Sequence, residues 1–174
     1  AATSPMISSM RVASDGAGYS LWQGMPLTRW RPDALGGQGG MLSVLRDGAS
    51  GELWSATLAP LGGAPERYEA VFAEGRASFR CEERGLAILS EAAVAPEDDV
   101  ELRRIRIRNT GATARTLDVT SQVALFAHAG EMPVQVDGAS QALLCAFGPA
   151  APTVLHAMAV RGAATAPRFS RACV

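Results

Sequence analysis

The sequence contains no lysine, and all sixteen of its basic residues are arginines. It therefore offers no candidate for a Schiff-base or lysine-nucleophile mechanism. There are two histidines, His128 and His156, and two histidines with no cysteine or carboxylate directly beside them make a poor metal site. The Gly-x-Ser-x-Gly nucleophile motif is also missing. We predict no catalytic residues, no metal site and no cofactor in this chain.

Cysteine and long apolar runs are also scarce. The three cysteines, Cys81, Cys145 and Cys173, are widely spaced, and an odd number is a poor basis for a disulfide framework. We expect reduced core thiols, which fits a cytoplasmic location. No run of about 18 apolar residues occurs, so no segment is predicted to span a membrane.

The charges of the chain are nearly balanced, with 16 basic against 17 acidic residues and a net charge of -1. A nucleic-acid binder would show a basic excess, so we expect no nucleic-acid partner. Hydrophobic residues make up 48% and charged residues 19% of the sequence, which excludes a disordered chain. We predict one folded domain over residues 1–174, in which roughly 70% of the unfolded surface is buried.

Period-two alternation of apolar and polar residues recurs along the chain, whereas helical periodicity is hard to find. The clearest alternation runs from Leu117 to Ala127, and Ile105 and Ile107 alternate with arginines before it. The turn residues 109–111 between the two segments predict a hairpin. Leu102 lies an odd number of residues from Ile105, which predicts either a β-bulge near residues 103–104 or a strand that changes the face it buries.

Further short strands are predicted between turn signals, among them Glu74–Gly75 and Arg84–Gly85. The strands are Tyr19–Trp22, Met25–Trp30, Met41–Arg46, Glu52–Thr57, Arg67–Ala73, Arg76–Glu82, Leu86–Val94, Ala142–Phe147 and Thr153–Val160. Short strands that follow one another at intervals of about 8–12 residues are typical of an all-β fold. We therefore predict an antiparallel β-sandwich.

Acidic residues cluster at two places, Glu82–Glu83 and Glu97–Asp99. A pair of carboxylates is what glycoside hydrolysis requires. Both clusters lie beside predicted turns, where adjacent acidic residues are usually solvated. We therefore expect surface groups at both places, and a small glycosidase that uses Glu97–Asp99 ranks last among the hypotheses.

Aromatic residues gather in the first third of the chain beside planar polar groups: Trp22, Arg29, Trp30, Arg31 and Asp33. Aromatic rings stack on the apolar faces of sugars, while guanidinium and carboxylate groups hydrogen-bond vicinal hydroxyls. These five residues form the predicted carbohydrate-binding patch. The alternative is that the tryptophans fill the sandwich core, since large aromatic side chains dominate core burial.

Several short motifs follow one another along most of residues 12–147. They are Ala17–Gly24, Leu27–Arg31, Leu45–Asp47, Gly51–Ala56, Arg67–Glu69, Val94–Glu101, Arg103–Asn109, Leu117–Ser121 and Ala142–Leu144. In this order they resemble the N-terminal β-sandwich of the inverting disaccharide phosphorylases of glycoside hydrolase family 94. They are also similar to the phosphorylase-like regions of bacterial cyclic β-1,2-glucan synthases.

The resemblance implies a large antiparallel sandwich, called a supersandwich. In the full enzymes this sandwich is followed by a helical linker and an (α/α)6 barrel. The resemblance also implies that the catalytic acid lies on the barrel, so this chain alone is not catalytic. The sandwich of the family contributes to the dimer, and the loop Arg29–Gly40 is expected to approach a neighbouring active site. The chain departs from the family by its short segment Ala129–Pro133 and by ending soon after Arg168–Phe169. We expect a fragment or a shortened version of the domain.

The sequence therefore predicts a non-catalytic, carbohydrate-associated domain of a cyclic β-glucan synthase or phosphorylase-like protein, which aids assembly and glucan binding. The alternative is a stand-alone carbohydrate-binding module for β-glucans. The expected partners are a weakly bound β-glucan oligosaccharide and either a second copy or a helical-barrel catalytic domain. Self-association is expected at the strands after Gln141, because unpaired strand edges invite pairing. The parent protein is expected at the inner membrane.

Overall fold

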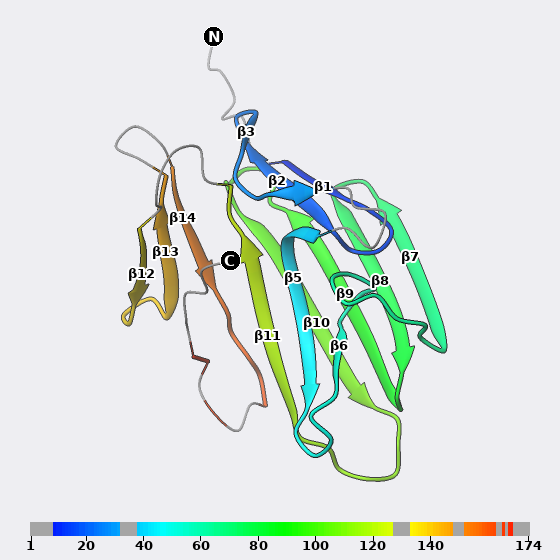
Figure 1. Ribbon diagram of the computed structural model, residues 1–174. Helices are drawn as coiled ribbons and strands as arrows, with labels where there is room; N and C mark the ends of the chain where they lie inside the picture. Colours follow the sequence, from blue (N-terminus) through cyan, green and yellow to red (C-terminus); the bar gives the residue numbers. More distant parts are fainter. Residues whose placement is uncertain are drawn as a thin grey trace. The chain divides into compact units, whose positions relative to one another are not determined.

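The computed structural model describes residues 9–31, 38–126, 133–147, 152–162, 165 and 167–168. Every regular element among these residues is a β-strand, and all the strand pairs are antiparallel, which confirms the all-β prediction. Among the same residues, no helix is long and apolar enough to cross a membrane. The chain forms two compact units, Ala1–Leu125 and Phe126–Val174 (Figure 1).

Fourteen strands are described in chain order. In the first unit they are β1 (Ser9–Val12), β2 (Gly18–Trp22), β3 (Met25–Pro26), β4 (Trp30–Arg31), β5 (Gln38–Asp47), β6 (Leu53–Ser55), β7 (Arg67–Ala73), β8 (Arg76–Glu83), β9 (Leu86–Val94), β10 (Glu101–Asn109) and β11 (Leu117–Ala124). In the second unit they are β12 (Val134–Asp137), β13 (Ala142–Ala146) and β14 (Thr153–Ala157). The predicted strands at Arg67–Ala73 and Leu86–Val94 have the same bounds in the structure.

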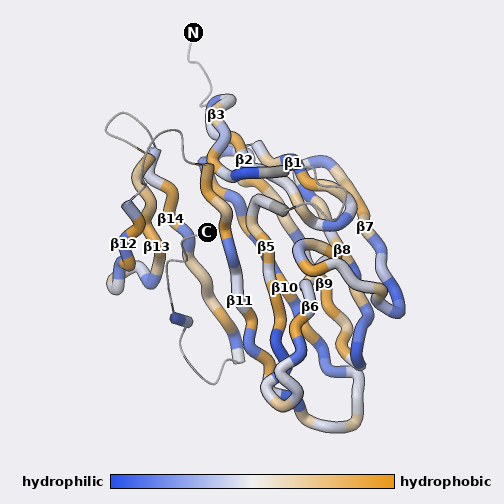
Figure 2. The backbone as a smooth tube through the Cα atoms, viewed as in Figure 1, coloured by the Kyte–Doolittle hydropathy of each residue, from blue (hydrophilic) through white to orange (hydrophobic). Residues whose placement is uncertain are grey.

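The first unit is a sandwich of two main sheets. One sheet has the strand order β10-β9-β8-β7, and the other has the order β11-β5-β4 with β6 also paired to β5. Alternate residues of β8 and β9 are buried, as period-two alternation predicts. Figure 2 shows apolar residues along the strands of both sheets.

The core lies between the two sheets. Buried residues of the second sheet and of the segment next to it pack against buried residues of the first sheet. The former are Leu45, Trp54 and Ala56, and the latter are Cys81, Leu86 and Ile88. Burial of a large apolar side chain stabilises the fold by about 1.5–3 kcal/mol. Trp54 is 3% exposed, so the core interpretation of the tryptophans holds for this residue.

A small sheet of order β1-β2-β3 lies against the start of β5. A Cβ atom added to Gly40 would lie 2.5 Å from the carbonyl oxygen of Gly18, and the φ angle of Gly40 is +79°. Glycine is therefore required at this position for two reasons: the backbone is left-handed, and strands β2 and β5 approach each other closely. This contact fixes β2, and with it Trp22, relative to the second sheet.

The predicted hairpin between residues 105–107 and 117–127 is wrong. β10 pairs with β9, and β11 pairs with β5, so residues 110–116 cross from one sheet to the other. The amide of Gly111 donates to Asn109 Oδ1 at 3.0 Å, while the amide of Thr110 donates to the carbonyl of Gly85 at 2.9 Å. The turn residues reverse the chain locally as predicted, but they do not select the strand that pairs with β11.

The predicted bulge near residues 103–104 is also wrong, because the pairing of β10 with β9 is continuous from Glu101 to Asn109. The alternative, a change of the buried face, is wrong too, because partly buried and exposed residues alternate from Glu101 to Arg108. Leu102 is 63% exposed and lies on the outer face with the arginines. The parity argument assumed that every apolar residue of the strand is buried. The predicted strand Met25–Trp30 is divided into β3 and β4, because the amide of Leu27 instead donates to the carbonyl of Ser20 at 2.9 Å.

The second unit contains a sheet of order β12-β13-β14. Ala142 and Cys145 of its central strand are buried, and His156 lies on β14. Cys81 and Cys145 are reduced and buried, as predicted. Cys173 and His128 lie outside the described residues.

Candidate functional site

Trp22, the first residue of the predicted carbohydrate-binding patch, ends β2 beside a tight turn. Gln23 and Gly24 have φ angles of 49° and 81°, the left-handed values that a two-residue hairpin turn requires. The indole Nε1 of Trp22 donates a hydrogen bond of 2.7 Å to Asp99 Oδ2. The structure thus joins the tryptophan to a carboxylate that lies 77 residues further along the chain.

Arg29 has an exposed side chain on a firmly held backbone. Its amide donates to the carbonyl of Ala124 at 2.8 Å, and its carbonyl accepts from the amide of Gly40 at 2.8 Å. The preceding residue, Thr28, is buried, and its Oγ1 accepts from the amide of Ser20 at 2.8 Å. The guanidinium therefore projects from a fixed point between β2, β5 and β11.

The remaining residues of the patch are placed less completely. Trp30 and Arg31 form β4 and pair with Gly39 and Gln38 of β5. The structure describes the backbone of Trp30 and Arg31 but not their side chains. Asp33 lies outside the described residues altogether. The structure brings Trp22 and Asp99 together, whereas a patch that also includes the other predicted residues stays a prediction.

A second carboxylate lies near Trp22, on the strand that follows Asp99. Ser20 Oγ donates to Glu101 Oε2 at 2.5 Å, and the other oxygen of Glu101 accepts from Arg103 Nε at 2.7 Å. The side chains of Glu101 and Arg103 are only 15% and 14% exposed, so this ion pair is shielded from solvent. Sequence reasoning missed the cluster, because nothing local links β2 with β10. The expectation of solvated acidic residues holds for the exposed Glu97 and Asp98.

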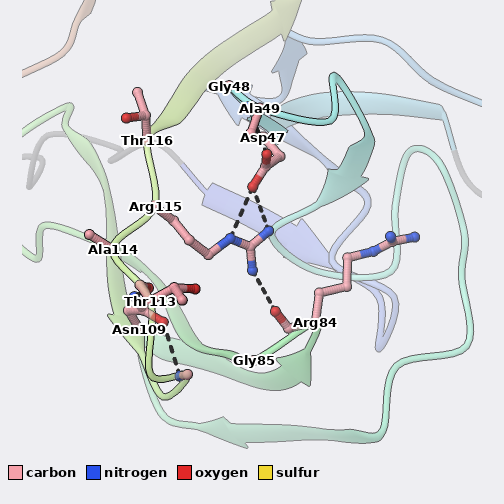
Figure 3. A pocket seen from close by; sticks show the side chains of 11 residues that line it. Asp47, Gly48, Ala49, Arg84, Gly85, Asn109, Thr113, Ala114, Arg115 and Thr116 are labelled. Atoms are coloured by element: carbon pink, nitrogen blue, oxygen red, sulfur yellow. Dashed lines mark hydrogen bonds and ion pairs between the residues drawn. The ribbon is translucent and has the colours of Figure 1, made fainter.

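An open cleft of about 660 Å³ lies at the other end of the sandwich (Figure 3). Turns from both sheets form its wall. The lining residues are Asp47, Gly48, Ala49, Arg84, Gly85, Asn109, Gly111, Thr113, Ala114, Arg115 and Thr116. None of these residues was among the predicted site residues.

Arg115 occupies the middle of this cleft. Its Nε and Nη2 donate to Asp47 Oδ2 at 2.9 and 2.6 Å, and its Nη1 donates to the carbonyl of Arg84 at 2.5 Å (Figure 3). Asp47 Oδ1 accepts from the amides of Ala49 and Ser50 at 2.8 and 2.9 Å. These amide hydrogen bonds and the guanidinium hold the pKa of Asp47 well below its usual range.

Trp54 contacts two guanidinium groups, those of Arg84 and Arg115, each with its central carbon 5.7 Å from the ring centroid. Arg84 also pairs with Glu52 at 2.7 Å and with Glu83 at 3.2 Å. The two arginines are therefore compensated by carboxylates, and the cleft does not concentrate positive charge. The hydrogen bonds and ion pairs in the cleft are suited to holding three segments in fixed positions: residues 47–49, 84–85 and 109–116.

Within the described part of the chain, no group of three or more histidine, cysteine or acidic residues could hold a metal ion.

Comparisons with known proteins agree on one relationship. Residues 7–141 match the family model described as "Glycosyl hydrolase 94, supersandwich domain". The chain is 37% identical over 113 residues to the cyclic beta-(1,2)-glucan synthase NdvB of Rhizobium meliloti (strain 1021), with 65% of this chain and 4% of that protein covered. It is 26% identical over 123 residues to the N,N'-diacetylchitobiose phosphorylase of Vibrio proteolyticus, with 67% and 15% covered. The chain thus spans a small part of the length of both relatives.

Proposed function

We propose that this chain, which belongs to the glycosyl hydrolase 94 supersandwich family, is a non-catalytic domain of a larger protein. That protein is a cyclic β-glucan synthase or a disaccharide phosphorylase-like protein. The observation that carries the proposal is the family match over residues 7–141. The similarity to a cyclic β-glucan synthase and to a chitobiose phosphorylase supports the same parent class. The reaction itself belongs to other parts of the parent protein.

The first role of the domain in this proposal is assembly. The sandwich presents side chains from both sheets in a fixed frame, because the Arg115–Asp47 pair holds its turns and the Gly18–Gly40 contact holds β2 against β5. A rigid domain of this kind can position a catalytic barrel or a second copy of the protein. The assembly role rests on this rigidity and on family membership.

The second role is weak contact with a β-glucan chain near Trp22, Arg29 and Asp99. A partly exposed indole can cover the apolar face of a sugar, while the carboxylate and the guanidinium hydrogen-bond its hydroxyl groups. Trp22 is oriented by its hydrogen bond to Asp99, which reduces the entropy lost on binding. The site is incomplete without a second domain, so we expect a Kd of about 1 mM, or roughly -4 kcal/mol.

A titration of the chain with β-1,2-glucan oligosaccharides tests this contact. We expect amide chemical-shift changes near Trp22 and Arg29, and we expect Trp22→Ala to abolish them. Phe72→Ala is the matched control, since Phe72 is an exposed aromatic residue on β7, outside the patch. Shift changes confined to residues 67–94, or binding that Trp22→Ala leaves unchanged, would refute the placement.

A separate measurement tests membership in a larger enzyme. The proposal predicts that the reading frame of the parent gene encodes a helical barrel, and that the purified barrel binds this chain. The alternative is a stand-alone carbohydrate-binding module, which would bind glucans with micromolar affinity and without any barrel. Micromolar binding together with a reading frame that lacks the barrel would favour that alternative.

A further inference from the structure

The strand β10 is an edge of its sheet among the described residues, because it pairs with β9 alone. Hydrogen bonds from Ala95 to Val100 and from Thr110 to Gly85, each of 2.9 Å, lie at the two ends of the ladder. In an antiparallel ladder the hydrogen-bonded pairs alternate. The backbone N–H and C=O groups of Arg103, Ile105 and Ile107 therefore point away from β9. They have no backbone partner among the described residues.

The two faces of β10 differ in chemistry. Its outer face carries the exposed Arg104, Arg106 and Arg108. Arg104 pairs with Glu91 at 2.7 Å, whereas Arg106 and Arg108 lie opposite Leu89 and Ala87. Neither of these two arginines forms an ion pair with another described residue.

The inner face of β10 carries the Glu101–Arg103 ion pair at the start of the strand and is apolar further along. Ile105 and Ile107 are partly buried and pack against the core cluster. A strand beside β10 would therefore meet aliphatic side chains on one face and unpaired guanidinium groups on the other. Opposite charges directly across a strand pair stabilise the pair, while like charges destabilise it.

We propose that the β10 edge takes up an extended segment of a partner protein in which acidic and aliphatic residues alternate. The acidic residues lie opposite Arg106 and Arg108, and the aliphatic residues extend the core beside Ile105 and Ile107. The backbone hydrogen bonds of strand addition supply affinity, and the alternating side chains supply specificity. This surface approaches the glucan contact near Trp22 only at the start of β10, where Glu101 accepts from Ser20. Arg106 and Arg108 lie toward the other end of the strand, so either proposal can fail alone.

A second copy of β10 is a poor occupant of the same edge. Antiparallel pairing of two β10 strands that keeps the isoleucines on the inner face places arginine opposite arginine. A shift of one residue would place arginines opposite isoleucines and reverse the faces. The arginines thus disfavour self-pairing, and they also select the charge of a partner.

The test uses a fluorescently labelled ten-residue peptide of alternating glutamate and valine, with binding followed by anisotropy. We expect saturable binding that the double variant Arg106→Glu/Arg108→Glu weakens at least tenfold. The control variant Arg67→Glu/Arg76→Glu changes exposed arginines on the same face, on β7 and β8, and should bind within twofold of the parent chain. An alternating lysine–valine peptide should bind the β10 double variant and not the parent chain.

Two N-methylated peptides distinguish strand addition from charge attraction. The valines opposite Ile105 and Ile107 use their own amides for the hydrogen bonds to β10 in an antiparallel pair. N-methylation of the valine amides should therefore abolish binding, while N-methylation of the glutamate amides should retain it. The proposal would be overturned if the two N-methylated peptides bound equally, or if no binding occurred at millimolar concentration. It would also be overturned if a peptide with its glutamates and valines in separate blocks bound as well as the alternating peptide.

Discussion

The guanidinium of Arg115 donates two hydrogen bonds, of 2.9 and 2.6 Å, to the same carboxylate oxygen of Asp47. Arg115 lies on the segment that crosses from β10 to β11, and Asp47 is the last residue of β5. A third hydrogen bond reaches the carbonyl of Arg84 in the turn between β8 and β9. One side chain thus ties the second sheet, the crossing segment and the first sheet together.

Loss of this tie should destabilise the sandwich. In Arg115→Ala the nearly buried Asp47 loses its cationic partner, and we expect the Tm to fall by about 5–10 °C. The matched control is Arg46→Ala, which breaks the Arg46–Asp118 pair, whose side chains are 53% and 63% exposed. An exposed pair contributes little, so the Tm of the control should change by less than about 2 °C. Calorimetry of both variants measures the difference, and equal losses would contradict the assignment.

The stability of the domain should fall in acid through Asp47. The pKa of this carboxyl is lower in the folded chain than in the unfolded chain, because amide hydrogen bonds and Arg115 favour its ionised form. The stabilisation is present above the unfolded pKa of about 3.9 and is lost as the pH falls toward the folded pKa.

Denaturant unfolding at a series of pH values from 7 to 3 tests this dependence. The stability difference between the parent chain and Asp47→Asn should be constant above about pH 5 and should shrink below about pH 4. A difference that stays constant down to pH 3 would show that Asp47 has an ordinary pKa in the fold.

The contact between β2 and β5 should make Gly40 sensitive to the smallest side chain. Gly40→Ala places a Cβ atom 2.5 Å from the Gly18 carbonyl oxygen at a φ angle of +79°. The control is Gly51→Ala, which has a φ angle of +74° and open space around the added Cβ. The control isolates the cost of the left-handed backbone, about 1 kcal/mol. Gly40→Ala should lower the free energy of unfolding by at least about 1 kcal/mol more.

The Cys81 thiol should be protected in the folded domain. Burial raises its pKa to about 11, and the residue is 1% exposed. Since the thiolate is the reactive form, alkylation by iodoacetamide at pH 8 should be at least about 100-fold slower in the folded chain than in denaturant. Peptide mass spectrometry follows the site. Similar rates in both conditions would contradict the buried position.

Most of the strands could be predicted from local patterns in the amino-acid sequence. The turn signals Glu74–Gly75 and Arg84–Gly85 and the proline at position 96 predict the bounds of Arg67–Ala73 and Leu86–Val94, because glycine and proline interrupt a strand. Both turns are confirmed, and Gly75 and Gly85 have positive φ angles there. The family motifs added the kind of sandwich, which the family match confirms.

Only the tertiary structure decided which strands pair and which side chains meet. The pairing of β11 with β5 rather than β10 depends on burial of both sheets at once, and no turn residue encodes it. The Trp22–Asp99 and Arg115–Asp47 contacts join residues 77 and 68 positions apart. Hydrogen bonds of this kind form wherever folding places a donor beside an acceptor, so they leave no periodic signal in the chain. Alternation is a property of one strand, whereas a site is a property of several strands packed together.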